Sequence, residues 1–480
     1  MTNSYYPPFT LPGAYAKLSH ICKEKLLALY GANPPRPAIK RLDAELRLLR
    51  RENLSSVYLL LHQLSVHLWE NGGKLGVRGT LGATLVSFLL GLTDIDPLPA
   101  HDRCSHCAHM IFSPRSSGYE LSPAACPNCD RLLQSDGHTI PYEACTELIR
   151  GKKVHTAEVN VSASAWETAV SFLTEFLGQE RVACACEWDH PVCFMLLPEG
   201  VEFAGVTPMP TPVCGVRTKT LLPGHQLTHA LFRLILLPCE DYDRIRLLHR
   251  LTGVRPEDID YSDPNIYTLF LRLDTCGIPG FSSDRSKEIL QQLQTLQFFD
   301  LIRVYAMTCG TGVWEGNGAQ LLRQHPIRDL VATRDDIFLT LQRYGIPPKT
   351  AQAVMERVRK GSFCEDTAQI RQLTHELLGA GVPTWYVESM QKIRYLFPKA
   401  QAAQCAKIAA TLAWFKVYHP AAFYHVSLAV MGASPSDASD TTGKLPHSCN
   451  NAEVTALLEE ASQRGVRTDS PDARAGNLAR

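Results

Sequence analysis

Apolar residues recur at helical spacing through the N-terminal part of the chain, which predicts helices between residues 14 and 70. Two successive stretches carry this spacing: Leu18, Ile21, Leu26, Leu27 and Tyr30, and then Leu42, Leu46 and Leu49. Between them lie Pro34, Pro35 and Pro37. Proline lacks the backbone donor that a continuing helix needs, so we expect the first helix to end there.

Residues 152–162 follow a different pattern, in which apolar and polar side chains alternate. Side chains alternate across a β-strand, so Thr156, Glu158 and Asn160 would share one face. The opposite face would carry Ala157 and Val159. We predict a strand here, a helix over 165–177, and short strands within 184–240.

From residue 241 to about residue 430 the pattern is helical again, with short loops marked by glycine and proline. A helix start is expected at Ser283 or Asp284, because both are good capping residues before a periodic apolar run. Beyond Gly432 the residues become small and polar. We predict one weak helix at 451–463 and a disordered end from Thr468.

A chain of 480 residues exceeds one simple core, so two or three domains are expected. The 48 Lys and Arg residues balance the 48 Asp and Glu residues, which excludes a chain-wide polycation. Any nucleic-acid surface must therefore be a local patch. No apolar run reaches the ~18–20 residues that span a bilayer, and the N-terminus does not resemble a signal peptide. We expect a reduced cytoplasmic protein without a membrane partner, associated with the nucleoid if it binds DNA.

The second predicted helix carries six basic residues against two acidic ones, Asp43 and Glu45. The basic residues are Arg36, Lys40, Arg41, Arg47, Arg50 and Arg51. A solvated helix face and a stripe that faces phosphates both fit this run. Two further basic clusters lie near predicted helix ends: Arg357, Arg359 and Lys360, and then Lys392, Arg394 and Lys399. Aromatic residues interleave with the last cluster. Core packing or phosphate contact would explain that pattern.

Residues 72–84 form a glycine-rich stretch that precedes an apolar helix. Glycine lets a backbone approach a ligand closely, and successive N–H groups at a helix start form an anion cradle. Arg78 adds a planar donor that suits phosphate oxygens. A structural turn fits the same stretch equally well.

Four of the 16 cysteines form two pairs, Cys104-x2-Cys107 and Cys126-x2-Cys129, with eighteen residues between them. Each pair can aim two thiolates at one ion, so this spacing predicts a closed, structural zinc ribbon. His106 and His109 are spare candidate ligands, which we expect to face solvent.

Taken together and in order, these motifs resemble the polymerase core of PolC, the Gram-positive-type DNA polymerase III alpha subunit, over about residues 5–431. Residues 76–82 resemble the family's Gly-Ser-Arg-Gly-Ser loop, and residues 395–400 (Tyr-Leu-Phe-Pro-Lys-Ala) are another collinear match. The resemblance implies an α+β fold, with a C-family polymerase palm and thumb, a zinc ribbon insertion and a large all-helical fingers domain.

In that scheme the helical region 1–75 is thumb- or palm-like, and 76–240 is palm-like with the ribbon at 101–133. Residues 241–431 are fingers-like, and 432–480 form a mostly disordered tail. The resemblance implies that the following residues bind nucleotide: Gly76, Arg78, Gly79, Thr80, Gly82, Lys392, Arg394 and Lys399. The implied partners are primer-template-like DNA, dNTP, and replication or repair proteins.

The departures from the family concern its three catalytic aspartates, which hold two Mg²⁺ ions. At the matching positions this sequence has Thr156, Glu158 and Ile235, so one carboxylate of three is kept. Mg²⁺ needs hard oxygen ligands, and the resemblance therefore implies a catalytically degenerate protein that uses Mg²⁺ only if it is active. Two alternatives stay open: a working polymerase whose metal site is rebuilt from Glu158 and another carboxylate, such as Glu240 or Asp241, and a scaffold that binds only proteins.

Overall fold

The computed structural model describes residues 10–145, 156–178, 182–185, 193–196, 211–213, 216–218, 232–432 and 451–466. The chain divides into two compact units. Unit 1 comprises Met1–Asp94, Leu148–Pro256 and His419–Arg480, and unit 2 comprises Ile95–Glu147 and Glu257–Tyr418. Both units are assembled from separate segments of the chain. The domain bounds expected from the sequence stay predictions. The palm, thumb and fingers assignments stay predictions.

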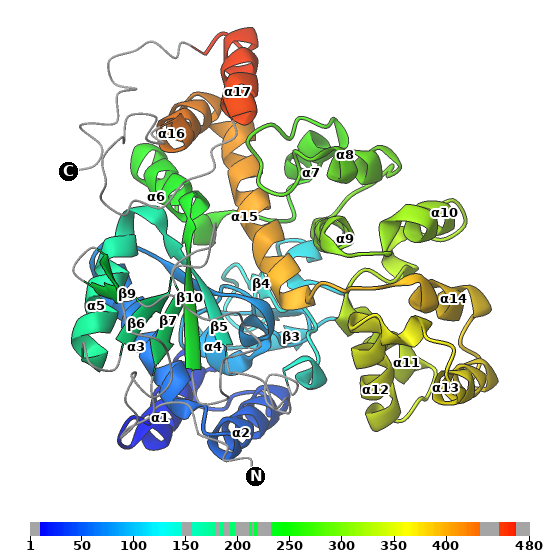
Figure 1. Ribbon diagram of the computed structural model, residues 1–480. Coiled ribbons are helices and arrows are strands. Elements are labelled where there is room, and N and C mark those ends of the chain that lie inside the picture. The colour runs from blue at the N-terminus through cyan, green and yellow to red at the C-terminus, as the bar shows by residue number, and fades with distance from the viewer. Residues whose placement is uncertain are drawn as a thin grey trace. The chain divides into compact units, whose positions relative to one another are not determined.

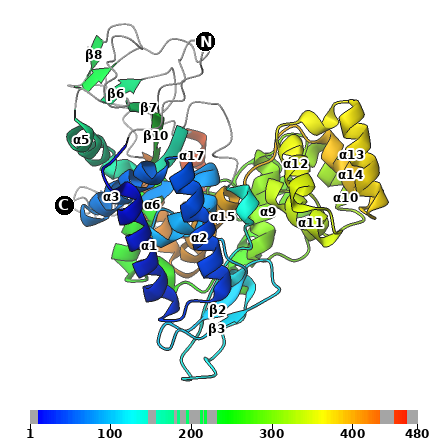
Figure 2. The same ribbon diagram turned by 90° about the horizontal axis from the view of Figure 1, so that it is seen from below.

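Unit 1 begins with three helices: α1 (Ala14–Tyr30), α2 (Arg36–Arg51) and α3 (Ser55–Glu70). Helix α1 packs beside α2 and α3 (Figure 2). Its buried residues Leu18, Cys22 and Leu26 repeat every four positions, which gives the apolar stripe that the sequence pattern predicts. The predicted break between α1 and α2 is confirmed, and Pro37 occupies the first turn of α2.

The described strands of unit 1 form a seven-stranded sheet in the order β1-β5-β10-β7-β6-β9-β8. The strand bounds are β1 (Leu75–Val77), β5 (Thr156–Ser162), β6 (Val182–Ala185), β7 (Cys193–Leu196), β8 (Thr211–Val213), β9 (Val216–Thr218) and β10 (Phe232–Cys239). Strand β5 pairs antiparallel with β1. On its other side it pairs parallel with β10, beside which it is labelled in Figure 1. The predicted strand is confirmed over residues 156–162, and its first positions lie outside the described residues.

The remaining helices of unit 1 are α4 (Leu85–Leu89), α5 (Trp166–Leu177), α6 (Glu240–Thr252), α16 (Pro420–Gly432) and α17 (Asn451–Gln463). Helix α5 packs against α3 and β5, and α6 packs against β5 and α16. The weak helix predicted at 451–463 is confirmed as α17. The disorder predicted from Thr468 lies outside the described residues.

Unit 2 combines a small sheet with many helices. The sheet has the order β3-β2-β4, with β2 at His101–Arg103, β3 at Met110–Phe112 and β4 at Gln134–Asp136. The helices are α7 (Pro264–Leu271), α8 (Asp284–Gln291), α9 (Phe298–Cys309), α10 (Ala319–Leu321), α11 (Arg334–Arg343), α12 (Pro348–Arg359), α13 (Ala368–Gly379), α14 (Thr384–Lys392) and α15 (Lys399–Tyr418). The start predicted at Ser283 is confirmed, because its Oγ caps α8 by accepting from the Ser286 N–H.

No helix among the described residues is long and apolar enough to cross a membrane.

Candidate functional site

Strands β5 and β10 bring the three expected catalytic positions together. Ile235 on β10 lies directly across from Glu158 on β5, and Arg233 lies across from Thr156. Thr156 and Glu158 share a face of β5, while Ala157 between them is buried on the other face. Ile235 shares that face with Glu158 because directly paired residues point the same way. At the three expected positions the face therefore offers one carboxylate, one hydroxyl and one apolar side chain.

This donor set does not fit a pair of Mg²⁺ ions, because each ion needs several hard oxygen ligands. Within the part of the chain that the structure describes, the four cysteines are the one cluster of three or more His, Cys, Asp or Glu side chains that could hold a metal. The alternative carboxylates are also remote. Glu240 begins α6, five positions after Ile235, and a strand rises about 3.3 Å per residue. It therefore lies roughly 16 Å along the sheet from the position opposite Glu158.

Arg78 lies over the polar face of β5. Its backbone N–H donates to the Glu158 carbonyl at 2.9 Å, and its Nη1 donates to Asn160 Oδ1 at 3.0 Å. Its Nε lies 3.8 Å from Glu158 Oε2. Half of the Glu158 side chain is exposed, so this ion pair contributes only about 0–1 kcal/mol. In this structure Arg78 pairs with the acid Glu158, and its contact with a triphosphate stays a prediction.

The glycine-rich stretch forms β1, the 3-10 turn Gly79–Ala83, and the start of α4. Gly76 lies in β1 across from Asn160, and Gly79 has a φ of 59°, a conformation that favours glycine. At the start of α4 two backbone N–H groups are occupied by a side chain of this chain, and nucleotide binding by the glycine-rich stretch stays a prediction. The Glu45 carboxylate accepts from the N–H of Leu85 at 3.0 Å and from the N–H of Val86 at 2.9 Å.

Glu45 is the residue at this site that sequence reasoning missed. It is fully buried on α2 and also forms an ion pair with Arg41, whose Nη2 donates to the Ala83 carbonyl at 2.9 Å. The signal available in the sequence was an Arg–Glu pair four positions apart, inside an otherwise apolar helix stripe. That spacing alone does not say which helix start the carboxylate reaches.

The four cysteines form a second candidate site, in unit 2. Their Sγ atoms all lie within 4.8 Å of one another, with Cys104 and Cys129 at 3.4 Å and Cys107 and Cys126 at 3.5 Å. Zinc–sulfur bonds of about 2.3 Å place the sulfurs of a tetrahedral site about 3.8 Å apart, so these residues fit one zinc ion. The backbone N–H groups of Cys107 and His106 lower the pKa of Cys104 to about 6, which favours the thiolate.

The histidines beside the cysteines do not join this cluster. His106 is exposed, as expected, and His109 is half-buried. The cysteine pairs extend from the small sheet: the Cys104 N–H donates to the His109 carbonyl at 2.9 Å, and the Cys126 N–H donates to the Arg131 carbonyl at 2.7 Å. These tight turns aim all four thiols at one point.

The three basic residues expected at the nucleotide differ in their surroundings. Lys392 and Arg394 are exposed, and Lys392 Nζ donates to the Gly316 carbonyl at 3.0 Å. Lys399 is buried, so it lies on no solvated face; its Nζ donates to the Thr139 carbonyl at 3.3 Å. Burial lowers the pKa of the Lys399 ammonium, and the carboxylates of Asp336 and Asp335 partly offset that effect. Nucleotide binding by these three residues stays a prediction.

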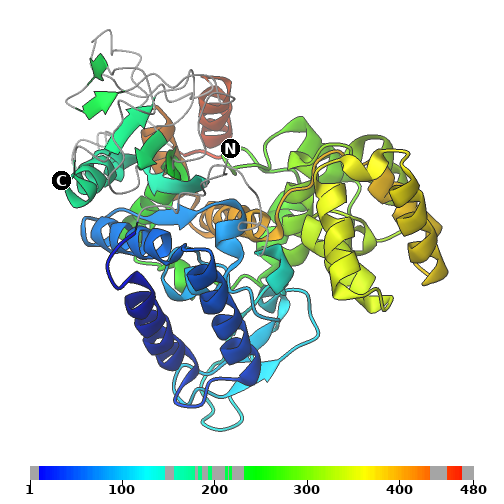
Figure 3. The same ribbon diagram turned by 60° about the horizontal axis from the view of Figure 1, so that its bottom comes forward.

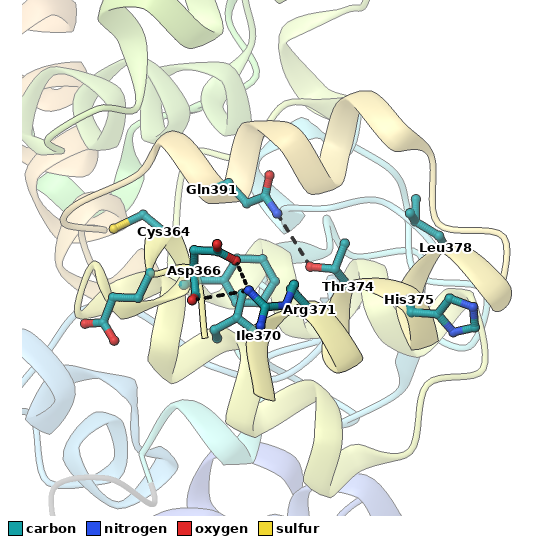
Figure 4. A pocket seen from close by; sticks show the side chains of 10 residues that line it. Cys364, Asp366, Ile370, Arg371, Thr374, His375, Leu378 and Gln391 are labelled. Atoms are coloured by element: carbon teal, nitrogen blue, oxygen red, sulfur yellow. Dashed lines mark hydrogen bonds and ion pairs between the residues drawn. The ribbon is translucent and has the colours of Figure 1, made fainter. Parts of the chain in front are cut away.

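A cavity of about 410 Å³ lies between α13 and α14 of unit 2 (Figure 4). Arg371 lines it but is paired with Asp366 at 2.6 Å, and Gln391 donates to Thr374 Oγ1 at 3.5 Å. Because Asp366 balances the charge of Arg371, the cavity has no excess positive charge for an anionic ligand.

Comparison with known proteins gives matches along most of the chain. Residues 16–187 match the bacterial DNA polymerase III alpha NTPase domain, and residues 243–378 match the bacterial DNA polymerase III alpha subunit finger domain. DNA polymerase III PolC-type of Clostridium perfringens is 29% identical over 87% of this chain. The Bacillus subtilis protein of the same name is 26% identical over 95% of the chain. The matched regions cover 33% and 35% of these relatives, so the chain spans about a third of their length.

Proposed function

Because this chain is a relative of the PolC-type DNA polymerase III and matches its alpha-subunit NTPase and finger domains, we propose that it is a PolC-like protein without polymerase catalysis. It keeps the family's scaffold and binds DNA, nucleotide or both. Its role is that of an accessory subunit in replication, repair or mobile-element biology.

The observation that supports this proposal is the donor set on the paired strands β5 and β10. By the resemblance, Thr156 and Ile235 stand where the family has aspartates; Ile235 pairs with Glu158 across the two strands, and Thr156 lies two positions before Glu158 on β5. A single exposed carboxylate cannot offset the charge of two divalent ions only a few Å apart. Each metal ion lowers the activation free energy by several kcal/mol, and each 1.36 kcal/mol changes the rate tenfold.

Primer extension on a primed template, with Mg²⁺ and separately with Mn²⁺, tests the loss of catalysis. We expect no extension by the wild-type chain. Extension that the Glu158→Ala substitution abolishes would refute the proposal, because it would make Glu158 part of a working metal site.

A matched variant restores the missing carboxylates. The double substitution Thr156→Asp with Ile235→Asp places three acids on one face of the sheet, and like charges at that distance favour a bound cation. We expect this variant to bind Mn²⁺ in electron paramagnetic resonance titrations at concentrations where the wild-type chain does not. Equal Mn²⁺ binding by both proteins would mean that the wild-type face already holds metal.

We also propose that the four cysteines hold one structural zinc ion. The convergence of four thiols, whose Sγ atoms all lie within 4.8 Å of one another, supports this assignment. Four protein ligands would close the coordination sphere, so the ion would stabilise the ribbon and leave no open position for a substrate.

Nucleic-acid binding separates the proposal from a scaffold that binds only proteins. Binding to DNA whose log K falls linearly with log salt means that phosphates are being neutralised. We expect such a slope; no binding up to about 10 µM protein would favour the protein-only scaffold. Nucleotide binding is tested separately by calorimetry, and no heat at millimolar dNTP would remove the nucleotide from the proposal.

A further inference from the structure

The exposed face of α2 is strongly basic. Of the six basic residues in this helix, Arg41 turns inward to Glu45. The other five are exposed: Arg36, Lys40, Arg47, Arg50 and Arg51. At 100° per residue all five fall within about a third of the helix circumference, and we call this surface the α2 basic face. The structure thus separates one structural arginine from five outward cations.

The charges of the α2 basic face are only partly balanced by acids. Arg51 donates to Glu52 at 2.8 Å, and the Arg50 guanidinium lies 4.8 Å from the centre of the Tyr15 ring. Asp43 is exposed on the same face. Five cations against Asp43 and Glu52 leave a net charge of +3. Among the residues that the structure describes, Arg36, Lys40 and Arg47 form no ion pair. A helix face stabilised by salt bridges would instead carry positive and negative residues in alternation.

The opposite side of α2 holds the basic face in a fixed place. Ala38, Leu42 and Leu46 are buried, and α2 packs against α1 and α4. Figure 3 shows α1 and α2 as the two neighbouring dark-blue helices. The apolar side is already covered by the protein, so α2 does not have the free apolar face of a membrane-surface helix. From Arg36 to Arg51 the helix is about 22 Å long, and a DNA duplex presents a phosphate charge every ~1.7 Å along its axis.

We propose that the α2 basic face binds the phosphate backbone of a nucleic acid. This inference rests on the proposed nucleic-acid-binding function and names the surface that carries it. Four of the five cations are arginines, whose planar forks match phosphate oxygens better than a lysine ammonium does. The contacts are to backbone phosphates, so binding through this face does not depend on base sequence.

The test compares the full chain with a triple variant, Arg36→Gln, Lys40→Gln and Arg47→Gln, by fluorescence anisotropy on a duplex between 50 and 200 mM salt. Each lost phosphate contact lowers the slope of log K against log salt by about 0.9, so we expect a decrease of about 2.7. Between 50 and 200 mM salt, the ratio of the wild-type binding constant to that of the variant should therefore fall by about 40-fold.

A matched control removes three exposed charges from unit 2, through Arg323→Gln, Arg343→Gln and Lys349→Gln. We expect this control to keep the wild-type slope. If the wild-type chain binds DNA and the α2 variant keeps the same affinity and slope, the inference about α2 is wrong while the proposed function stands. If the wild-type chain binds no DNA, the inference about α2 and the DNA-binding part of the proposed function both fail. Binding of polyglutamate as tight as that of DNA would instead assign the face to an acidic protein.

Discussion

Substitution of Glu45 tests how the glycine-rich turn is held. The Glu45 carboxylate is fully buried, pairs with Arg41, and accepts the N–H groups of Leu85 and Val86 at 3.0 and 2.9 Å. Glu45→Ala leaves the Arg41 charge and two backbone donors without this acceptor. Removing one partner of a buried pair costs about 3–5 kcal/mol. Glu45→Gln keeps the shape and one acceptor oxygen, so its loss should be smaller.

Hydrogen exchange with mass spectrometry measures this effect locally, which matters because a chain with two units need not unfold in one step. A loss of about 3 kcal/mol speeds exchange in peptides from α2 and α4 by roughly a hundredfold. The control is Glu24→Ala, an exposed acid on α1, which should change stability by less than about 0.5 kcal/mol. Exchange in Glu45→Ala within threefold of the wild type would refute the reasoning.

Three further predictions concern cysteines and pH. Elemental mass spectrometry of the purified chain should find one zinc ion per molecule. The Cys126→Ser variant should lose this zinc, and the control variant Cys364→Ser should keep it. Equal zinc content in the two variants would contradict the predicted zinc ribbon. Burial and the Glu45 carboxylate raise the pKa of Cys22 to about 12, so about one thiol in ten thousand is ionised at pH 8. Cys22 should therefore resist iodoacetamide in the folded chain, and rapid labelling found by peptide mapping would argue against its burial. Burial and the charges of Lys407 and Lys399 lower the pKa of His138 well below 6.5. As the pH falls, His138 is therefore protonated at a higher pH in the unfolded chain than in the folded chain. The free energy of unfolding of unit 2 should therefore decrease below about pH 6.5, and this decrease should be smaller in His138→Gln. Urea titrations at pH 7, 6 and 5 measure it; an equal decrease of the unfolding free energy in both proteins would contradict the prediction.

Local patterns in the sequence were sufficient for most elements of the fold. The helices of residues 14–70, the strand at β5, the long helical region and α17 follow from apolar periodicity, proline breaks and capping residues. The cysteine pairs predict their own cluster, because each Cys-x2-Cys turn fixes the direction of two thiols within four residues. The resemblance alone, without coordinates, also implies that Thr156 and Ile235 stand where the family has aspartates, and this stays a prediction.

Only the tertiary structure decided which of these groups meet. Glu45 reaches the start of α4 forty positions away, and Arg78 reaches Asn160 across 82 positions. Lys399 belongs to a basic cluster in the sequence, yet folding buries it beside Thr139. Periodicity records which side of an element is apolar, but the choice of partner depends on packing between distant segments. For that reason the sequence alone could not separate inward Arg41 from the five outward cations of α2.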